Sequence, residues 1–189
     1  MHSTRIATFL LGAWIACCLF VDLAALMNVR MAAQMMNSAI PAAAEILQSA
    51  GRQQTGQLLH HFAAEQYRYY FSQWGMIQLA VVLALAGLLY FAAEKRILPQ
   101  ILCLVILVLV IFQLAIGPEL AYRGREADFP PGSLSLDTQS RVLALTEIWA
   151  GVEIAKFIVG CALAAFLFSF RSKRRPRRSN EPVSLVRAE

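Results

Sequence analysis

The stretch from Val142 to Phe170 reads VLALTEIWAGVEIAKFIVGCALAAFLFSF, an apolar run interrupted by Glu147, Glu153 and Lys156. A helix rises about 1.5 Å per residue, so about 20 residues cross the roughly 30 Å hydrocarbon core of a bilayer. The run is therefore long enough to span a membrane. Lys156 lies near its middle, where a charge costs roughly 2.5–3.5 kcal/mol on insertion scales. We expect this lysine to have a partner or a function.

Three further apolar segments accompany this one. Hydrophobic residues make up 58% of the chain, above the roughly 45–50% of soluble domains, and the mean hydropathy is +0.55. Strands of a transmembrane barrel would alternate apolar and polar residues, whereas Leu102–Ile111 is continuously apolar. We therefore predict an all-α integral membrane four-helix bundle over residues 1–170. The predicted spans are residues 6–27, 74–93, 98–118 and 142–170.

Basic residues indicate how the spans are oriented. The last segment, residues 171–189, contains seven basic and two acidic residues, which accounts for the net charge of +5 of the whole chain. Arg5 precedes the first span, and Lys95 and Arg96 separate the second from the third. Because Lys and Arg concentrate on the cytoplasmic side, we predict that both termini are cytoplasmic, in the inner membrane of a bacterium.

The C-terminal segment is expected to be a disordered tail that contacts the bilayer. Juxtamembrane clusters of four to eight basic residues bind anionic headgroups, so we expect lipid rather than nucleic acid as the partner. The basic residues next to the last span are Arg171, Lys173, Arg174, Arg175, Arg177 and Arg178.

The two connections on the outer side differ in composition. Residues 28–73 are rich in Ala, Gln, Leu, Glu and Met, which predicts a helical excursion outside the membrane, including a short helix from about Ser38 to Ser49. Residues 118–140 contain three prolines and two glycines, so we expect an irregular outer loop there.

Polar residues recur at one predicted depth. Asp22, Gln78, Gln113 and Lys156 each lie about 14–16 residues from the cytoplasmic end of their span, and Glu153 is one turn from Lys156. We predict that these five side chains form an inward-facing cluster at mid-membrane. Gln73, Glu119 and Glu147 are expected nearer the outer surface.

Two interpretations of this cluster remain open. Polar side chains between membrane helices can simply neutralise one another and set the helix register. They can also form a relay for protons or ions, or a polar substrate pocket.

Cofactor sites are weakly supported by the sequence, and we expect no cofactor. The three histidines, His2, His60 and His61, lie outside the predicted spans, so an intramembrane bis-histidine haem site is excluded. Met27, Met31 and Met35 share one helical face, and thioethers favour Cu(I). These methionines are weak candidates for a copper site that His60 and His61 would complete, with a packing stripe as the alternative.

Short motifs in the chain resemble a four-helix membrane protein family of unknown function that includes the eukaryotic transmembrane protein 205. They are Gly12 in the first span, Ala50-Gly51-Arg52, Tyr67-Arg68-Tyr69-Tyr70, Gly117-Pro118-Glu119 and Arg141 before the fourth span. The similarity covers about residues 5–170. It implies a four-span fold and no known catalytic residues.

These observations favour a non-enzymatic membrane protein, because the chain contains no catalytic motif. We expect a structural or accessory subunit that belongs to a larger membrane complex or forms a homo-oligomer. The alternative is a small oligomeric transporter or an ion- or proton-handling protein that uses the polar cluster. Copper handling through the methionine stripe ranks third.

Overall fold

The computed structural model describes residues 2–36, 51–91, 97–128 and 136–173, and these ranges are almost entirely helical. The helices are α1 (His2–Met36), α3 (Arg52–Phe91), α4 (Ile97–Asp128) and α5 (Leu136–Lys173). All four are long and apolar enough to cross a membrane. The prediction of an all-α chain with four such helices is therefore confirmed. The short helix expected from about Ser38 to Ser49 and the tail beyond residue 173 lie outside the described residues.

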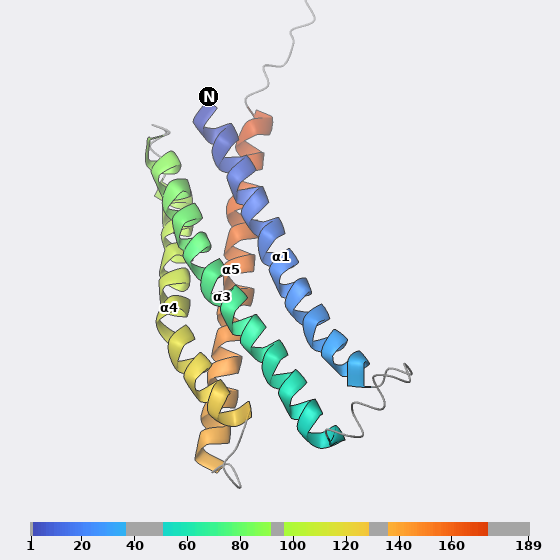
Figure 1. Ribbon diagram of the computed structural model, residues 1–189. Coiled ribbons are helices and arrows are strands. Elements are labelled where there is room, and N and C mark those ends of the chain that lie inside the picture. The colour runs from blue at the N-terminus through green and yellow to red at the C-terminus, as the bar shows by residue number, and fades with distance from the viewer. Residues whose placement is uncertain (1, 37–50, 92–96, 129–135, 174–189) are drawn as a thin grey trace, which may run out of the picture.

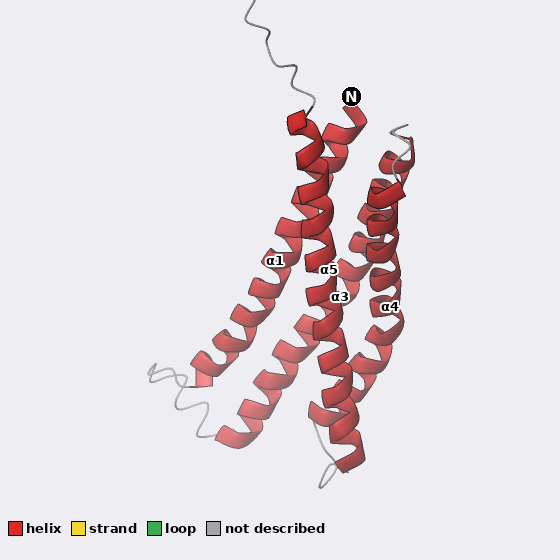
Figure 2. Ribbon diagram, turned by 180° about the vertical axis from the view of Figure 1, so that it is seen from behind, coloured by secondary structure: helices red, strands yellow, loops and turns green. Residues whose placement is uncertain are grey.

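The four helices run side by side along one long axis (Figure 1). α1 packs against α3, α3 against α4 and α4 against α5, and a smaller contact between α1 and α5 closes the bundle. Figures 1 and 2 both show α1 diverging from α5 away from the N-terminus. We call the end of the bundle that holds the N-terminus the terminal end and the opposite one the far end. Phe91, Ile97 and Lys173 lie at the terminal end, whereas Met36, Asp128 and Leu136 lie at the far end.

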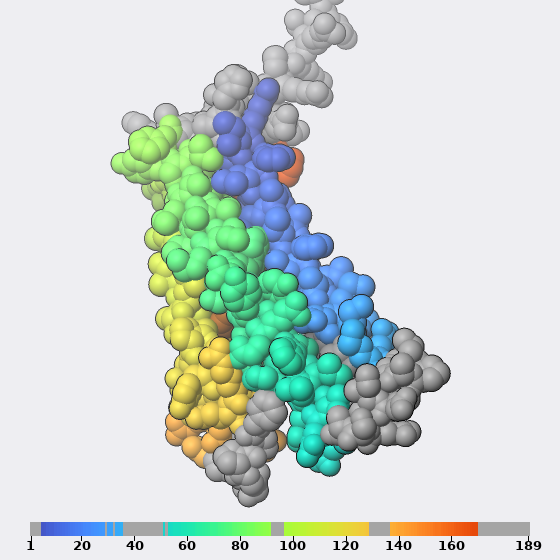
Figure 3. Space-filling view, viewed as in Figure 1, coloured from blue at the N-terminus to red at the C-terminus, as the bar shows by residue number. Residues whose placement is uncertain are grey.

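A narrow apolar core lies between the helices. Leu11, Val82, Ile106 and Leu163 come from the four different helices, and each is fully buried. Large apolar side chains also cover the outside of the bundle, and Phe9 on α1 is 78% exposed. Figure 3 shows one face of the bundle, on which α1, α3 and α4 lie side by side. Soluble monomers rarely expose continuous apolar surface of this extent, so the exterior is suited to lipid.

We predicted an irregular loop over residues 118–140, but both ends of this segment are helical. The prediction is therefore wrong for these ends. α4 continues through Pro118 to Asp128, and α5 begins at Leu136. A proline removes one backbone hydrogen bond, but membrane helices tolerate this loss where neighbouring groups compensate for it. Ion pairs from Arg68 and Glu65 on α3 hold the extended end of α4 in place. Residues 129–135 lie outside the described residues.

Two glycines of α5 provide a test of how closely α1 must pack against α5. A Cβ atom at Gly160 would lie 2.9 Å from Cζ3 of Trp14, whose ring is buried, whereas at Gly151 nothing lies within 4 Å. We expect Gly160→Ala to lower the unfolding temperature in detergent relative to Gly151→Ala, because overpacking costs about 1–3 kcal/mol. The gain in helix propensity is the same in both variants. Equal unfolding temperatures of the two variants would show that α1 can move away from α5 without a loss of stability.

Candidate functional site

The Lys156 side chain lies in the centre of the bundle and is 1% exposed. Its Nζ donates hydrogen bonds to Gln78 Oε1 on α3 at 2.8 Å, to Gln113 Oε1 on α4, and to Glu153 Oε1 on its own helix at 3.0 Å. An ammonium has three protons, and each of them meets an acceptor. The lysine therefore joins three of the four helices at one point.

Glu153 completes this group, which we call the polar centre (Gln78, Gln113, Glu153 and Lys156). It lies one turn before Lys156 and accepts a second hydrogen bond from Gln113 Nε2. Gln113 thus accepts from the ammonium and donates to the carboxylate. Gln78 and Gln113 are 1% and 4% exposed. Because one positive and one negative charge are paired and hydrogen-bonded, the polar centre is neutral, which lowers the cost of its burial.

Asp22 is near the polar centre but is not bonded to it. Four of the five residues expected to converge are linked by hydrogen bonds, whereas Asp22 is exposed at the side of α1 that faces α5. None of the hydrogen bonds or ion pairs among the described residues involves it. It lines a cavity of about 220 Å³, which we call the α1–α5 groove. The groove is bordered by Trp14, Ile15, Cys18, Leu19, Asp22, Glu153, Ile154, Lys156 and Phe157.

A larger cavity of about 700 Å³ lies between α3, α4 and α5 toward the far end. Along α4 its lining runs from Gln113, which bonds Lys156, to Asp128. Its walls are mostly apolar and include Phe71 and Trp149, whose ring centroids are 5.9 Å apart. The cavity therefore connects the polar centre with the charged groups at the far end.

These far-end groups form an ion-pair network that we did not predict. Asp128 on α4 accepts from Arg68 on α3 at 2.7 Å and lies 2.9 Å from His61 Nδ1. Arg125 on α4 bonds both carboxylate oxygens of Glu65, with the second bond at 3.0 Å. The i, i+3 spacing of Glu65 and Arg68 is a signal that could have pointed to a charged helix face. Nothing in the sequence indicates which residues of α4 pair with it.

The other predicted polar residues do not join these groups. Glu119 pairs with Arg123 one turn further along α4, whereas Gln73 and Glu147 are exposed on α3 and α5. Arg171 and Lys173 belong to the last turn of α5. Arg174, Arg175, Arg177 and Arg178 lie outside the described residues.

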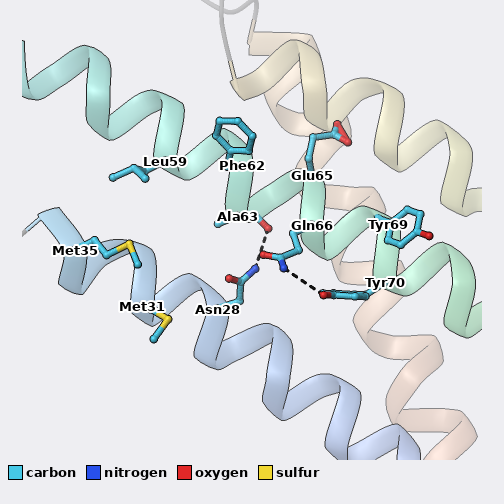
Figure 4. A pocket seen from close by; sticks show the side chains of 10 residues that line it. All are labelled: Asn28, Met31, Met35, Leu59, Phe62, Ala63, Glu65, Gln66, Tyr69 and Tyr70. Atoms are coloured by element: carbon cyan, nitrogen blue, oxygen red, sulfur yellow. Dashed lines mark hydrogen bonds between the residues drawn. The ribbon is translucent and has the colours of Figure 1, made fainter. Parts of the chain in front are cut away.

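The methionine stripe borders a separate cavity of about 720 Å³ between α1 and α3 (Figure 4). Met31 and Met35 line it beside Phe62, Tyr69 and Tyr70, whereas Met27 is exposed on the same helix outside this lining. Asn28 Nδ2 donates to the Ala63 carbonyl oxygen at 3.4 Å and connects the two helices there.

The histidines expected to complete a copper site lie elsewhere. His61 lies against Asp128, and His60 lines the cavity between α3, α4 and α5. Within the described part of the chain, no group of three or more His, Cys, Asp or Glu side chains could hold a metal ion. The two histidines therefore do not complete a copper site with the methionine stripe.

No family model, curated protein or solved structure matches the chain. The resemblance to the transmembrane protein 205 family therefore stays a prediction.

The polar centre leads to a first prediction. Lys156→Met removes the positive partner of Glu153 and the donor to two glutamines, so we expect a loss of about 3–5 kcal/mol in the free energy of unfolding in detergent. Adding Glu153→Gln should restore much of this loss, because the remaining amides can bond one another. The coupling energy of a pair is the difference between the effect of the double substitution and the sum of the two single effects. The exposed Arg141–Asp137 pair is the matched control, and its coupling energy should be about 0–1 kcal/mol. Equal coupling energies for the two pairs would contradict the assigned role of Lys156.

The far-end network leads to a second prediction, for groups outside the predicted spans. The hydrogen bond from Arg125, with the charges of Arg125 and Arg68, lowers the pKa of Glu65 from 4.5 to about 2. A lowered pKa in the folded state stabilises the protein above the unfolded-state pKa, and this stabilisation is lost as the pH falls toward the folded-state value. Wild type should therefore exceed Glu65→Gln in unfolding temperature by a constant margin above about pH 5, and the margin should vanish near pH 2. Glu147→Gln is the control, and a margin that does not change with pH would contradict the prediction.

Proposed function

We propose that the chain is an integral membrane protein in which all four helices cross the bilayer. The support is the combination of four long apolar helices with an exterior of exposed large apolar side chains. The helices exceed the roughly 20 residues that a bilayer requires, so their far ends protrude on one side. The ion pairs of Glu65, Arg68, Arg125 and Asp128 belong to this protruding part.

We further propose that both termini lie in the cytoplasm. In Figure 1, α1 begins, α3 and α5 end, and α4 begins at the terminal end of the bundle. In the sequence, Arg5 belongs to the start of α1, Lys95 and Arg96 lie between α3 and α4, and a run of basic residues follows α5. Such a one-sided distribution of basic residues is typical of the cytoplasmic side of a bacterial inner membrane. We also propose that the basic tail binds anionic lipid, because juxtamembrane clusters of basic residues are attracted to anionic headgroups.

The function that the geometry supports best is that of a non-enzymatic structural or accessory protein. The observation that carries this conclusion is that all three Lys156 protons are bonded to protein acceptors on α3, α4 and α5. An ammonium in this state has no donor left for a substrate, and its charge is neutralised by Glu153. The polar centre is thus suited to holding three helices in register, and the exposed apolar faces are suited to lipid or a partner.

A second candidate function is the handling of a proton or a small cation. The observation that favours it is Asp22, which lies in the α1–α5 groove without a hydrogen bond or ion pair among the described residues. Carboxylates at mid-membrane depth commonly mark ion or proton pathways. Four helices are few for a transporter, so this function would require an oligomer.

Purification from membranes distinguishes these functions. The full chain carries a C-terminal fluorescent protein that folds only in the cytoplasm and is extracted in mild detergent. We expect fluorescence, retention in the membrane fraction and, for the accessory function, a stoichiometric larger partner. A homo-oligomer that conducts protons or cations in vesicles would instead support the second candidate. Release of the chain into the soluble fraction would contradict both.

A further inference from the structure

The α1–α5 groove has an unbalanced charge. Its lining contains two carboxylates, Asp22 and Glu153, and one ammonium, that of Lys156. Lys156 gives all three protons to the polar centre and has none left for Asp22. When all three groups are ionised, the groove therefore carries one net negative charge. At the depth of Lys156 in a bilayer this charge is costly unless a cation compensates it.

Acceptor atoms remain free on both sides of the groove. Both bonds to the Glu153 carboxylate go to Oε1, and Oε2 accepts no hydrogen bond from the described residues. Asp22 accepts none either. The two carboxylates thus face one small space from opposite helices, α1 and α5.

The rest of the groove is apolar and partly aromatic. Trp14 and Phe157 line it together with Ile15 and Leu19. Aromatic rings pack against aromatic and branched apolar groups, and they also attract an ammonium group that lies near the ring. The volume of about 220 Å³ suits one compact organic group.

Other occupants fit this lining less well. Calcium and magnesium ions take six or more ligands, mostly oxygens, and two carboxylates in an apolar wall do not supply them. Among the described residues, no group of three or more His, Cys, Asp or Glu side chains could hold another metal ion. A second copy of the chain brings no free cation, because the only basic residue at this depth in the described helices is Lys156, which is buried and fully bonded.

We propose that the α1–α5 groove binds one small amphipathic organic cation per chain. The ammonium lies between Asp22 and Glu153, and an aromatic or branched apolar substituent lies against Trp14 and Phe157. This proposal rests on the membrane location and deepens the second candidate function, since it names the class of cation that the site takes.

The test uses the full chain in lipid nanodiscs and the probe benzyltrimethylammonium. Its neutral isostere, neopentylbenzene, has the same shape without the charge. We expect calorimetry to show saturable binding of one equivalent of the cation, and only non-saturable partition of the isostere into lipid. Equal binding of the cation and its isostere, or no saturable binding of the cation, would overturn the proposal. Asp22 would then be available to bind a proton or a partner protein.

Substitutions test whether the cation binds in the groove. Asp22→Asn should weaken binding about tenfold or more, because an ionic contact in a desolvated site is lost. Asp22→Glu should retain most of the affinity. The matched control, Asp137→Asn, removes an exposed carboxylate far from the groove and should leave the affinity unchanged. An unchanged affinity in a folded Asp22→Asn variant would refute the site.

A second measurement does not depend on the folding of any variant. A photoreactive benzylammonium is crosslinked to the wild-type chain, and the labelled residues are identified by mass spectrometry. Labels should fall on 14–22 and 153–157, and labelling confined to other segments would overturn the proposal. Failure of both binding experiments would leave the membrane location and the accessory role intact, because extraction and co-purification test those separately.

Discussion

The arrangement of the bundle depends on the hydrogen bonding of one ammonium group. Lys156 would be costly between apolar helices if any of its protons lacked an acceptor. Its three acceptors come from α3, α4 and α5, so the charge is tolerated only when these helices are in the observed register. The apolar contacts on either side of the polar centre do not have this selectivity, because in the proposed bilayer lipid would solvate Leu and Ile about as well as another helix does.

α1 differs from the other helices because it takes no part in the polar centre. It packs along α3 and meets α5 over a shorter length, where Gly160 allows the Trp14 ring to approach. Further toward the far end α1 diverges from α5 (Figure 2). Asp22 on α1 and Glu153 on α5 both line the α1–α5 groove. The least constrained helix thus borders the site with an unmatched charge.

Counting residues along the spans was sufficient to predict four members of the polar centre. The helical rise is constant, so Gln78, Gln113 and Lys156 must lie at similar depths once the spans are aligned, and Glu153 follows from its spacing. The same count placed Asp22 at that depth but did not predict its rotation about the α1 axis, which sets its distance from Lys156. The prediction of an irregular loop from residue 118 was wrong at its start, where α4 continues to Asp128. Composition alone does not reveal the ion pairs that hold the end of α4 against α3.

The sequence by itself determined that the chain forms four long apolar helices and that a lysine lies in the middle of the last one. These properties depend on local composition, helix propensity and a fixed rise per residue. Only the tertiary structure decided that Arg68 meets Asp128, that Arg125 meets Glu65, and that Lys156 bonds two glutamines in preference to Asp22. Those pairings depend on the crossing angle and rotation of whole helices, which arise from packing between residues far apart in the chain.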